Sequence, residues 1–336
     1  MKQFGLAVVG AGEIAQNFHL PILMKLPNVK PLAICDKNKS TAAFVAKKYE
    51  IPFTCENIYD ILDDDSIEAV DICASTDAHR DIAIAALEAG KSVLIEKPVA
   101  RSLEEAKEIA EAEKKSKGKC MIGMTQRFRY DTIMLKNFVH SGELGDVFYI
   151  KAGWLQQKRG TQWLDQLEKS GGGVLLDLGI SLIDSLVWIY DFAAVKSVKA
   201  TMYQHQTKNV EDVCIATIHF ENGSIATLEM SWSLFTSKNT FYCDVYGNNG
   251  SASVNPIQLF KNEEGVFHPV AEDPSRGKIS IFKKSFESVL KHFANAVLDY
   301  APVHSTAQEA VEIMKILRAM YRSADEQREV LLEEIS

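Results

Sequence analysis

The sequence predicts two domains of different class: an N-terminal doubly wound α/β domain with a parallel sheet, and a C-terminal α+β domain built on a large, mainly antiparallel open sheet. At 336 residues the chain exceeds the size at which a single hydrophobic core usually stops growing. Continuous apolar runs alternate with helical patterns up to about residue 125, and longer runs of alternating polarity follow. We therefore place the domains at residues 1–123 and 124–336.

The first domain is expected to contain five buried strands joined by helices. The runs that predict strands are 4–10, 29–35, 69–75, 92–98 and 119–125, and the helical patterns cover 13–25, 40–49, 77–89 and 103–116. Strands that are apolar throughout are typical of parallel sheets with helices on both faces. Such a sheet binds its ligand beyond the carboxyl ends of the strands.

Segments of the second domain alternate in polarity, as expected for strands with one covered face. These segments are 146–154, 195–205, 211–220, 223–233 and 239–247, and turn sequences such as FENGS at 220–224 join several of them. Further helices are expected at 131–141, 283–298 and 306–323. The apolar segment 171–190 is the expected helix over the covered face, and the polar segment 263–280 is expected to be a loop.

Composition excludes several classes of partner. The net charge of −8 offers no basic surface for nucleic acid or acidic lipid. No run approaches the roughly 18 unbroken apolar residues of a membrane span, and the N-terminus enters a strand without a secretory signal. The six cysteines lack C-x-x-C spacing, which favours reduced, buried thiols. We expect a cytoplasmic protein that acts on a small molecule.

The segment VVGAGEIA at 8–15 follows the first strand and opens the first helix. Gly10 permits a tight turn, Gly12 lets the backbone approach a pyrophosphate, and the small Ala15 stands where a third glycine would complete G-x-G-x-x-G. The helix N-terminus, with Glu13 and Ile14, supplies N–H groups for phosphates. A tight β–α turn without a ligand is the alternative interpretation.

Asp36 strengthens the prediction of a dinucleotide site. It ends the second strand. Its separation from the glycines is close to the ~20 residues expected of an acid that binds the adenosine ribose. A carboxylate there repels a 2′-phosphate, so NAD is preferred to NADP, although Lys37 beside it softens that preference. The alternative for Asp36 is a solvated loop residue.

The segment VLIEKPVA at 93–100 places Glu96, Lys97 and Pro98 directly after a buried strand. Alone this is also compatible with a chance charge pair at a strand end. In order and spacing, however, five segments resemble the Gfo/Idh/MocA oxidoreductases, the family of glucose-fructose oxidoreductase and inositol dehydrogenase. They are VVGAGEIA, AICDKN, ASTDAHRDIAIAALEAGKSVLIEKP, GMTQRFRYD and SGGGVLLDLGISLID.

The resemblance implies a Rossmann domain, an open-sheet domain and nicotinamide-dependent oxidation or reduction of a sugar, cyclitol or related compound. It places Lys97 beside the nicotinamide and the reacting oxygen. A lysine in a partly dehydrated cleft near a nicotinamide cation is expected to exchange a proton near neutral pH and to steady an alkoxide. Glu96 is expected to help fix Lys97 and the ribose, and the Lys97–Pro98 bond is suggested to be cis.

The second signature of the family, D-x-G-x-H-x-x-D, is matched at 177–184 with Ser181 in place of the histidine. On a helix, Asp177, Ser181 and Asp184 share one face. Three interpretations stay open: Lys97 is the sole acid and base while Ser181 binds substrate; Asp177, Ser181 and a water form a relay; or catalysis is weak or lost. Asp177 either lines the substrate pocket or holds a neighbouring loop, and for Asp184 we favour a carboxylate satisfied inside the domain.

Further site residues follow from the resemblance. Ser75, Thr76 and His79 lie where the family touches the cofactor, although His79 fits helix-end packing equally well. Arg127 matches a position near the nicotinamide and substrate, with an interdomain salt bridge as the alternative. Arg159 and Trp163 belong to the expected substrate loop, where Trp163 either stacks on a sugar or packs in the core. No metal site is expected, because the histidines lack ligand spacing with Cys or carboxylates.

We therefore expect an NAD-dependent dehydrogenase or reductase that acts on a polyhydroxylated small molecule, with Lys97, Asp177 and Ser181 as its catalytic residues. A non-catalytic NAD-binding sensor or regulatory subunit is the alternative. A homodimer or homotetramer is expected through the second sheet, whose outer face is taken to include Tyr203, Trp232 and Tyr242. The sequence does not specify the substrate, because loop geometry around 155–170 decides it.

Overall fold

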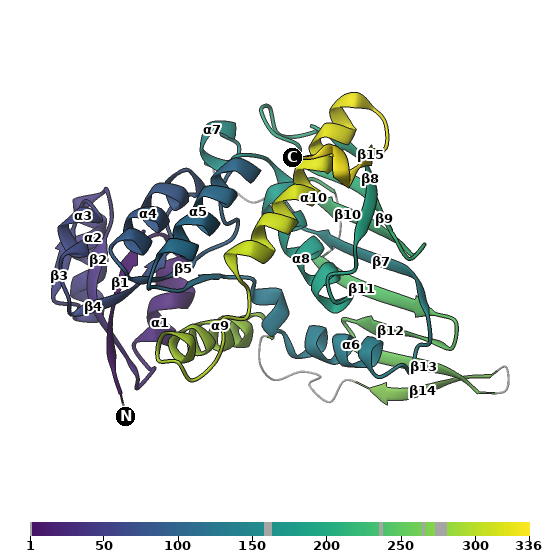
Figure 1. Ribbon diagram of the computed structural model, residues 1–336, viewed down its shortest axis with the longest axis horizontal. Coiled ribbons are helices and arrows are strands. Elements are labelled where there is room, and N and C mark those ends of the chain that lie inside the picture. Colours follow the sequence, from purple (N-terminus) through teal and green to yellow (C-terminus); the bar gives the residue numbers. More distant parts are fainter. Residues whose placement is uncertain (1, 158–162, 235–237, 264–265, 273–280) are drawn as a thin grey trace. The chain divides into compact units, whose positions relative to one another are not determined.

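The computed structural model describes residues 2–157, 163–234, 238–263, 266–272 and 281–336, and the chain divides into two compact units (Figure 1). The first unit comprises Met1–Thr125 and Phe282–Glu312. The second comprises Gln126–Ile281 and Ile313–Ser336. The expected boundary at 123/124 therefore lies close to the observed one, but the second stretch of the first unit was not anticipated.

The first unit is built on a six-stranded sheet in the order β3-β2-β1-β4-β5-β6, with every pair parallel. Its strands are β1 Phe4–Val9, β2 Val29–Cys35, β3 Phe53–Cys55, β4 Ile67–Ile72, β5 Ser92–Ile95 and β6 Cys120–Ile122. Its helical elements are η1 Ala15–His19, α1 Leu20–Leu23, α2 Lys39–Tyr49, α3 Tyr59–Leu62, α4 Thr76–Glu88 and α5 Leu103–Lys115. This confirms the predicted doubly wound domain.

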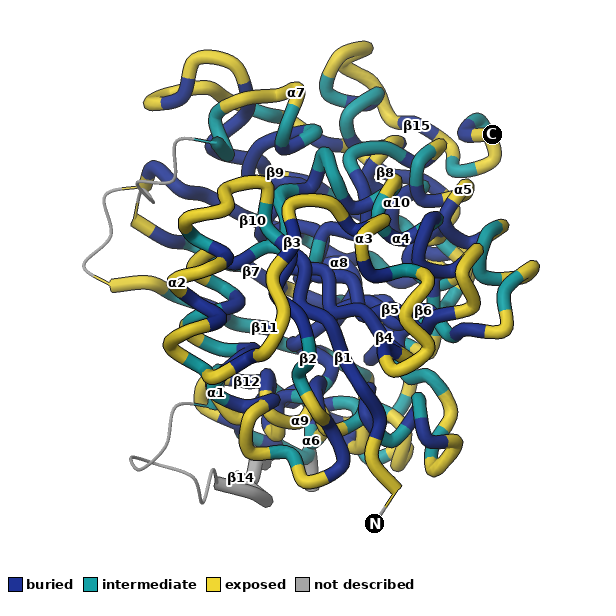
Figure 2. The backbone as a smooth tube through the Cα atoms, turned by 90° about the vertical axis from the view of Figure 1, so that its left-hand side faces the viewer, coloured by how far each residue is buried: buried dark blue, intermediate teal, exposed yellow. Residues whose placement is uncertain are grey.

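Burial and helix caps explain this arrangement. Every residue of β1 and β5 is buried, as continuous apolar strands require, and Figure 2 shows these strands as the dark interior of the unit. Asn38 and Ser102 cap α2 and α5 by accepting backbone N–H groups of Thr41 and Glu105. Because β1, β4 and β5 are neighbours, their carboxyl ends lie side by side, and the residues that follow them form one ligand-binding edge.

The second stretch of the first unit begins with α9, Ile281–Val297. Phe286 stacks on Phe18 with ring centroids 4.6 Å apart, and Phe282 meets the same ring edge-on at 5.6 Å. Further along, the Ile122 N–H donates to the Ser305 carbonyl at 2.9 Å, at the edge strand of the sheet. Aromatic packing and edge pairing therefore group 282–312 with the first unit, a contact that the sequence did not anticipate.

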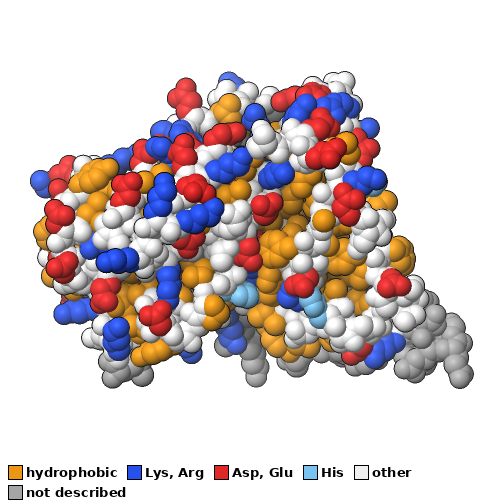
Figure 3. All heavy atoms as spheres, in the orientation of Figure 1, with side chains coloured by type: hydrophobic (Ala, Val, Ile, Leu, Met, Phe, Trp, Pro, Cys, Tyr) orange, Lys and Arg blue, Asp and Glu red, His pale blue; other side chains and the backbone are white. Residues whose placement is uncertain are grey.

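The surface of the first unit carries charges of both signs. On the face drawn in Figure 3, acidic and basic side chains are interspersed over α4 and α5. Arg80 of α4 pairs with Glu108 of α5, and Arg101 pairs with Glu105. These ion pairs are partly exposed, so they contribute little to stability. This face offers no patch of a single sign.

The second unit contains a nine-stranded sheet among the described residues, in the order β14-β13-β12-β11-β7-β10-β9-β8-β15. The strands are β7 Val147–Leu155, β8 Val195–Tyr203, β9 Val213–Phe220, β10 Ile225–Ser231, β11 Thr240–Gly247, β12 Gly250–Val254, β13 Gln258–Glu263, β14 Val266–Glu272 and β15 Val330–Leu331. The β7–β10 pair is parallel and the others are antiparallel. The open, mainly antiparallel sheet is confirmed, whereas the loop expected at 263–280 is wrong where β14 pairs with β13.

The helical elements that accompany this sheet are η2 Thr125–Phe128, α6 Tyr130–His140, α7 Leu167–Ser170, η3 Leu175–Gly179, α8 Ile180–Ile189, α10 Ala307–Glu326 and η4 Leu332–Glu334. Of these, α6 and α8 lie over one face of the sheet and contact β12 and β7 (Figure 1). Every residue of η3 and α8 is buried, and α8 contacts both β7 and α6. Within the described chain, the stretch Leu167–Ile189 has the length and composition of a membrane span, but its apolar window is completely buried as a core helix is.

Candidate active site

The glycine loop after β1 has the geometry that a dinucleotide requires. Gly10 has φ +93°, and a Cβ on it would lie 2.5 Å from the Ala74 backbone nitrogen, so only glycine fits there. A Cβ on Gly12 would meet nothing within 4 Å, so Gly12 faces open space. Ala15 is fully buried. Gly10 therefore makes the tight turn and Gly12 faces open space, and the binding of a pyrophosphate at Gly12 stays a prediction.

Asp36 lies beside this loop. Its Oδ2 accepts the Ala11 N–H at 2.8 Å, and its Oδ1 accepts the Asn38 N–H at the same distance. The side chain is half-buried, and Lys37 next to it is exposed. Asp36 thus closes the glycine loop onto the end of β2, and its role towards a ribose stays a prediction. Glu13 is exposed and Ile14 half-buried at the start of the same helix.

The start of α4 lies at the same edge of the sheet. Ser75 is the N-cap residue, and Thr76 and His79 are buried. The His79 ring lies between two carbonyl oxygens, with Nδ1 2.8 Å from that of Pro98 and Nε2 3.0 Å from that of Ala74. Burial lowers the pKa of His79. His79 therefore ties α4 to the segment that carries Lys97, and its contact with a cofactor stays a prediction.

The Glu96-Lys97-Pro98 segment follows β5. Lys97 is half-buried, and the Lys97–Pro98 peptide bond is cis, as suggested from the sequence. Glu96 is buried, and its Oε2 accepts the backbone N–H of Lys97 at 3.1 Å. A carboxylate therefore holds the backbone of the expected catalytic lysine at the carboxyl edge of the sheet.

His19 was not anticipated as a site residue. It is 1% exposed at the end of η1, with Nδ1 2.8 Å from Asp71 Oδ2 and Nε2 2.9 Å from Glu96 Oε1. The ligand atoms of His19, Asp71 and Cys73 lie within 4.8 Å of one another, a spacing that a metal ion also uses. Because both ring nitrogens lie at hydrogen-bond distance from carboxylate oxygens, hydrogen bonding accounts for this cluster without a metal.

In the second unit, Arg127 pairs with Asp184. Arg127 Nε and Nη2 lie 2.9 and 2.6 Å from the two carboxylate oxygens of Asp184, and both side chains are 1% exposed. The expectation that Asp184 is satisfied inside its domain is confirmed. Arg127 and Asp184 belong to the same unit, so this salt bridge is not an interdomain one. The role of Arg127 near a cofactor stays a prediction.

Asp177 lies in the π-helical turn η3, and Ser181 lies in the first turn of α8. Asp177 Oδ2 accepts the indole N–H of Trp232 at 3.1 Å, and both aspartate and serine are buried. Trp232 is 4% exposed, so its assignment to the outer face of the sheet is wrong: its indole turns inward to the acid. Tyr203 is exposed and Tyr242 half-buried, as a partly open outer face requires.

Glu211 holds the start of the same helix. Its carboxylate accepts the N–H groups of Gly173 and Leu175 at 3.0 Å and the hydroxyl of Tyr321 at 2.9 Å. Burial raises the pKa of Glu211, while these donors oppose that shift. A buried carboxylate therefore accepts hydrogen bonds from the backbone N–H groups just before Asp177. The N-terminus of a helix favours negative charge at this place.

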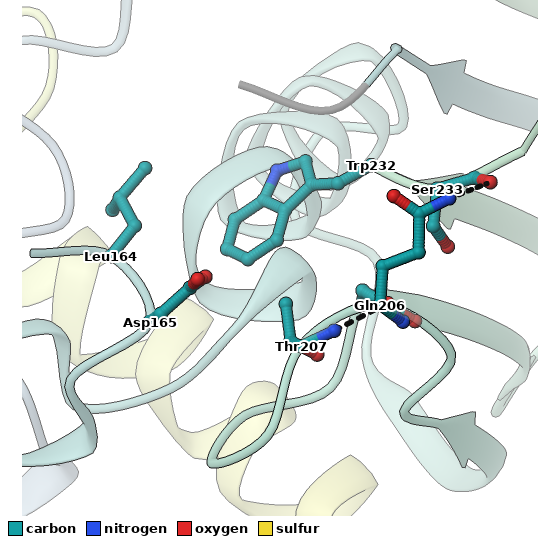
Figure 4. Close-up of a pocket in the computed structure, with 7 residues that line it drawn as sticks. Leu164, Asp165, Gln206, Thr207, Trp232 and Ser233 are labelled. Atoms are coloured by element: carbon teal, nitrogen blue, oxygen red, sulfur yellow. Dashed lines mark hydrogen bonds between the residues drawn. The ribbon is translucent and has the colours of Figure 1, made fainter. Parts of the chain in front are cut away.

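A small pocket lies beside Trp232 (Figure 4). Figure 4 shows the indole with Leu164 and Asp165 on one side and Gln206 and Ser233 on the other. The pocket is lined by Leu164, Asp165, Gln206, Thr207, Asp212, Trp232 and Ser233. Asp212 shapes the wall by accepting the N–H groups of residues 205–207 at 2.6–3.1 Å. Trp232 thus lines this pocket and contacts Asp177, a link that the sequence did not reveal.

The expected substrate loop is described only in part. Trp163 is half-buried and is followed directly by the pocket residues Leu164 and Asp165. Arg159 lies outside the described residues, and its role stays a prediction. Neither residue is therefore assigned to the pocket itself.

Two family models match nearly the whole chain. Residues 4–124 match the NAD-binding Rossmann fold of an oxidoreductase family, and residues 136–332 match the C-terminal alpha/beta domain of that family. The chain is 27% identical over 341 residues to D-glucoside 3-dehydrogenase of Escherichia coli (strain K12), with 95% of each protein covered. It is also 27% identical over 306 residues to scyllo-inositol 2-dehydrogenase (NAD(+)) of Bacillus subtilis (strain 168), covering 88% of this chain and 86% of that protein.

Solved structures agree with the fold. A levoglucosan dehydrogenase in complex with NADH and levoglucosan superimposes with a TM-score of 0.88 at 22% identity, covering 98% of this chain and all of that one. GenD2 from gentamicin A biosynthesis, in complex with NAD, gives 0.87 at 23% identity, with 98% and 97% covered. The glycine loop, the E-K-P segment and both family models agree, and the chain belongs to the Gfo/Idh/MocA family of NAD-binding oxidoreductases.

Proposed function

We propose that the protein is an NAD(H)-dependent dehydrogenase or reductase of a sugar, cyclitol or related polyhydroxylated small molecule, in which Lys97 donates or accepts the proton. The observation that carries the proposal lies within the first unit. Gly12 faces open space after β1, and Lys97 follows β5 at the same carboxyl edge of the sheet. A doubly wound domain binds its dinucleotide at this edge, and this supports a role for Lys97 beside the cofactor.

The residues present fit NAD. The helix that starts after Gly12 directs its first N–H groups to the open space where a pyrophosphate would bind. Asp36 offers a carboxylate at the end of β2, which suits a ribose with free hydroxyls and opposes a 2′-phosphate. When bound, NAD supplies or accepts the hydride. NAD is therefore proposed over NADP.

The proton chemistry falls to the chain itself. Lys97 takes the hydroxyl proton of an alcohol during oxidation, or returns a proton to a carbonyl oxygen during reduction. Its ammonium form also stabilises negative charge on the substrate oxygen. Glu96 keeps the backbone of Lys97 in place through the hydrogen bond to its N–H.

Asp177 and Ser181 are proposed to bind substrate hydroxyl groups. The indole N–H of Trp232 restricts Asp177 to one orientation, which suits a carboxylate that accepts a directed hydrogen bond. A serine hydroxyl has no acid–base chemistry near neutral pH comparable to that of histidine. We therefore assign proton transfer to Lys97 and orientation to Ser181; a relay of Asp177, Ser181 and a water is the second possibility.

Turnover with a panel of sugars, cyclitols and their keto forms tests this proposal, with either NAD or NADP and with reduced-nicotinamide absorbance as the signal. Lys97→Met is expected to abolish turnover while cofactor affinity stays within a few-fold of the parent. Tight NAD binding without turnover of any compound would count against the enzyme and for the alternative below. An active Lys97→Met variant would overturn the role of the lysine.

The alternative is a non-catalytic NAD-binding sensor or regulatory subunit. Ser181 favours it, because the buried position in α8 where the family has histidine carries no imidazole. Ser181→His separates the two. In a sensor that has lost only this group, the variant gains turnover from an inactive parent, whereas an enzyme that relies on Lys97 is already active before the change.

Two further assignments accompany the proposal. We propose a homodimer or homotetramer formed through the outer face of the second sheet, where Tyr203 and Ile215 are 46% and 53% exposed. Light scattering that shows a monomer at micromolar concentration contradicts it. We also propose a cytoplasmic location, for which the six buried free cysteines are the support.

A further inference from the structure

The ring of His19 lies between two buried carboxylates that come from different strands. Asp71 belongs to β4 and Glu96 follows β5, and the two contacts to the ring are 2.8 and 2.9 Å. A carboxylate oxygen only accepts hydrogen bonds, and a neutral imidazole has a single N–H. Both contacts are therefore hydrogen bonds at the same time only when the ring is an imidazolium.

The surroundings favour this charged form. Burial alone lowers the pKa of His19, but the charge of Asp71 and the hydrogen bonds of Asp71 and Cys73 outweigh it and raise that pKa well above 6.5. Cys73 lies 3.4 Å from Nδ1, and burial raises the pKa of its thiol to about 12, so it contributes no charge near neutral pH. From α9, the uncharged ring of Phe286 meets the imidazole at a centroid distance of 5.6 Å.

Glu96 links this cation to Lys97. Its Oε1 faces His19 and its Oε2 accepts the Lys97 N–H, so both oxygens are engaged. Space is also reserved for this carboxylate, because a Cβ on Gly123 would lie only 3.2 Å from Oε1. His19, on the helix that begins at the glycine loop, is therefore connected to the backbone of Lys97 through the Glu96 carboxylate.

We propose that His19 is a positioning residue for Lys97: its imidazolium, held by Asp71, fixes the Glu96 carboxylate and balances its charge beside the lysine. The inference rests on the proposed function of Lys97. One cation between two carboxylates leaves the cluster with one net negative charge. Removal of His19 leaves two negative charges near Lys97, and removal of the Glu96 charge leaves none.

The test measures the reactivity of Lys97 itself, so it does not depend on turnover. The acylation rate of the Lys97 peptide by acetic anhydride is followed by mass spectrometry as a function of pH, in the parent protein and in His19→Gln, Glu96→Gln and Cys73→Ala. An extra negative charge favours the protonated lysine, so the pH of half-reactivity rises in His19→Gln and falls in Glu96→Gln. Cys73→Ala removes an uncharged neighbour of the same ring and leaves this pH unchanged.

These opposite shifts distinguish charge balance from structural support. A merely structural role for His19 moves both variants in one direction or neither, and that result overturns the proposal. Nitrogen-15 spectra of the histidine rings give a second measurement: the resonance absent from His19→Gln must report a doubly protonated ring well above pH 6.5. A neutral ring there, or a stoichiometric metal ion bound to the purified protein, also overturns it.

If the parent turns over a substrate, His19→Gln is expected to lower kcat by about 10²-fold through misplacement of Lys97, with NAD affinity within a few-fold. Unchanged kcat beside an inactive Lys97→Met would refute the positioning role and leave the proposed function intact. Absence of turnover in the parent would refute the proposed function, and the labelling and nitrogen-15 experiments would still decide the state of His19.

Discussion

Two helices of this protein begin in the same unusual way and hold their polar residues differently. In the first unit, the π-helical turn Ala15–His19 leads into α1; in the second, the π-helical turn Leu175–Gly179 leads into α8. His19 in the first is held by two carboxylates. Asp177 and Asp184 in the second accept from Trp232 and from Arg127. π-Helical turns are frequent at functional sites, and here each carries or precedes buried polar groups.

The difference shows how each helix tolerates buried charge. His19 contacts residues at the ends of two neighbouring strands, so its position is coupled to the sheet edge that is proposed to hold the cofactor. The contact of Asp177 in η3 with Trp232 and the contact of Asp184 in α8 with Arg127 do not involve Ser181. Ser181 lies between them in the sequence, at the position where this chain departs from its family. The second helix can therefore keep its structure while its chemistry changes.

The largest expected effect comes from breaking the buried ion pair of the second helix. Asp184→Asn leaves Arg127 buried beside an uncharged group and is expected to destabilise the protein by about 3–5 kcal/mol. The double variant Arg127→Met with Asp184→Leu should recover most of this loss, because both charges of the pair are removed together. Urea denaturation measures both. Equal stability of Asp184→Asn and the parent would show that the pair does not support α8.

In the first unit, substitution of the two glycines of the dinucleotide loop is expected to have different effects, on stability at Gly10 and on NAD binding at Gly12. Gly10→Ala forces a side chain into positive φ and against the Ala74 backbone, and is expected to cost roughly 1–3 kcal/mol or more. Gly12→Ala enters open space, so stability should stay within about 0.5 kcal/mol while NAD affinity falls. Thermal unfolding and NAD titration report the two effects. The reverse pattern would reassign the two glycines.

A smaller effect is expected at the hydrogen bond that orients Asp177. Trp232→Phe keeps a ring but removes the indole donor to Oδ2. A hydrogen bond to a charged group contributes about 1.5 kcal/mol or more, so KM for the substrate should rise about tenfold while kcat changes less. Steady-state kinetics tests this with Trp163→Phe as the comparison. A fall confined to kcat would mean that Asp177 acts on the reaction rather than on binding.

The smallest effects are slopes of stability against pH, one in each unit. The folded-state pKa of Glu211 is raised above 4.5, so its contribution is complete below that pH and is lost as the pH rises through the folded value. The folded-state pKa of His19 is raised above 6.5. Its contribution to stability is therefore complete below pH 6.5 and is lost as the pH rises through the folded value. Denaturation across pH should show that Glu211→Gln removes the lower slope and His19→Gln the upper one. Slopes that survive these changes would have another origin.

Much of the first unit could be predicted because its signals are local. Continuous apolar runs mark the strands. The glycine loop, Asp36 and the E-K-P segment each follow a strand directly, and parallel topology assigns them all to one edge of the sheet. The helical period predicted the polar face of the 171–190 helix in the same local way. Local signals did not reveal the pairing of β14 or the packing of 282–312, because edge-strand pairing and aromatic packing on Phe18 depend on distant residues.

The sequence by itself determined that there are two domains and where the dinucleotide loop lies. It also determined the place of Lys97 after β5 and the replacement of a family histidine by Ser181. Strand order and short motifs encode each of these features. Tertiary structure decided which buried groups meet. Asp71 stands alone in an apolar run until β4 and β5 lie side by side and His19 bridges to Glu96. Trp232 resembles a sheet-surface residue until its indole reaches Asp177. Partners of buried polar groups are fixed by packing between distant segments, and no local period records them.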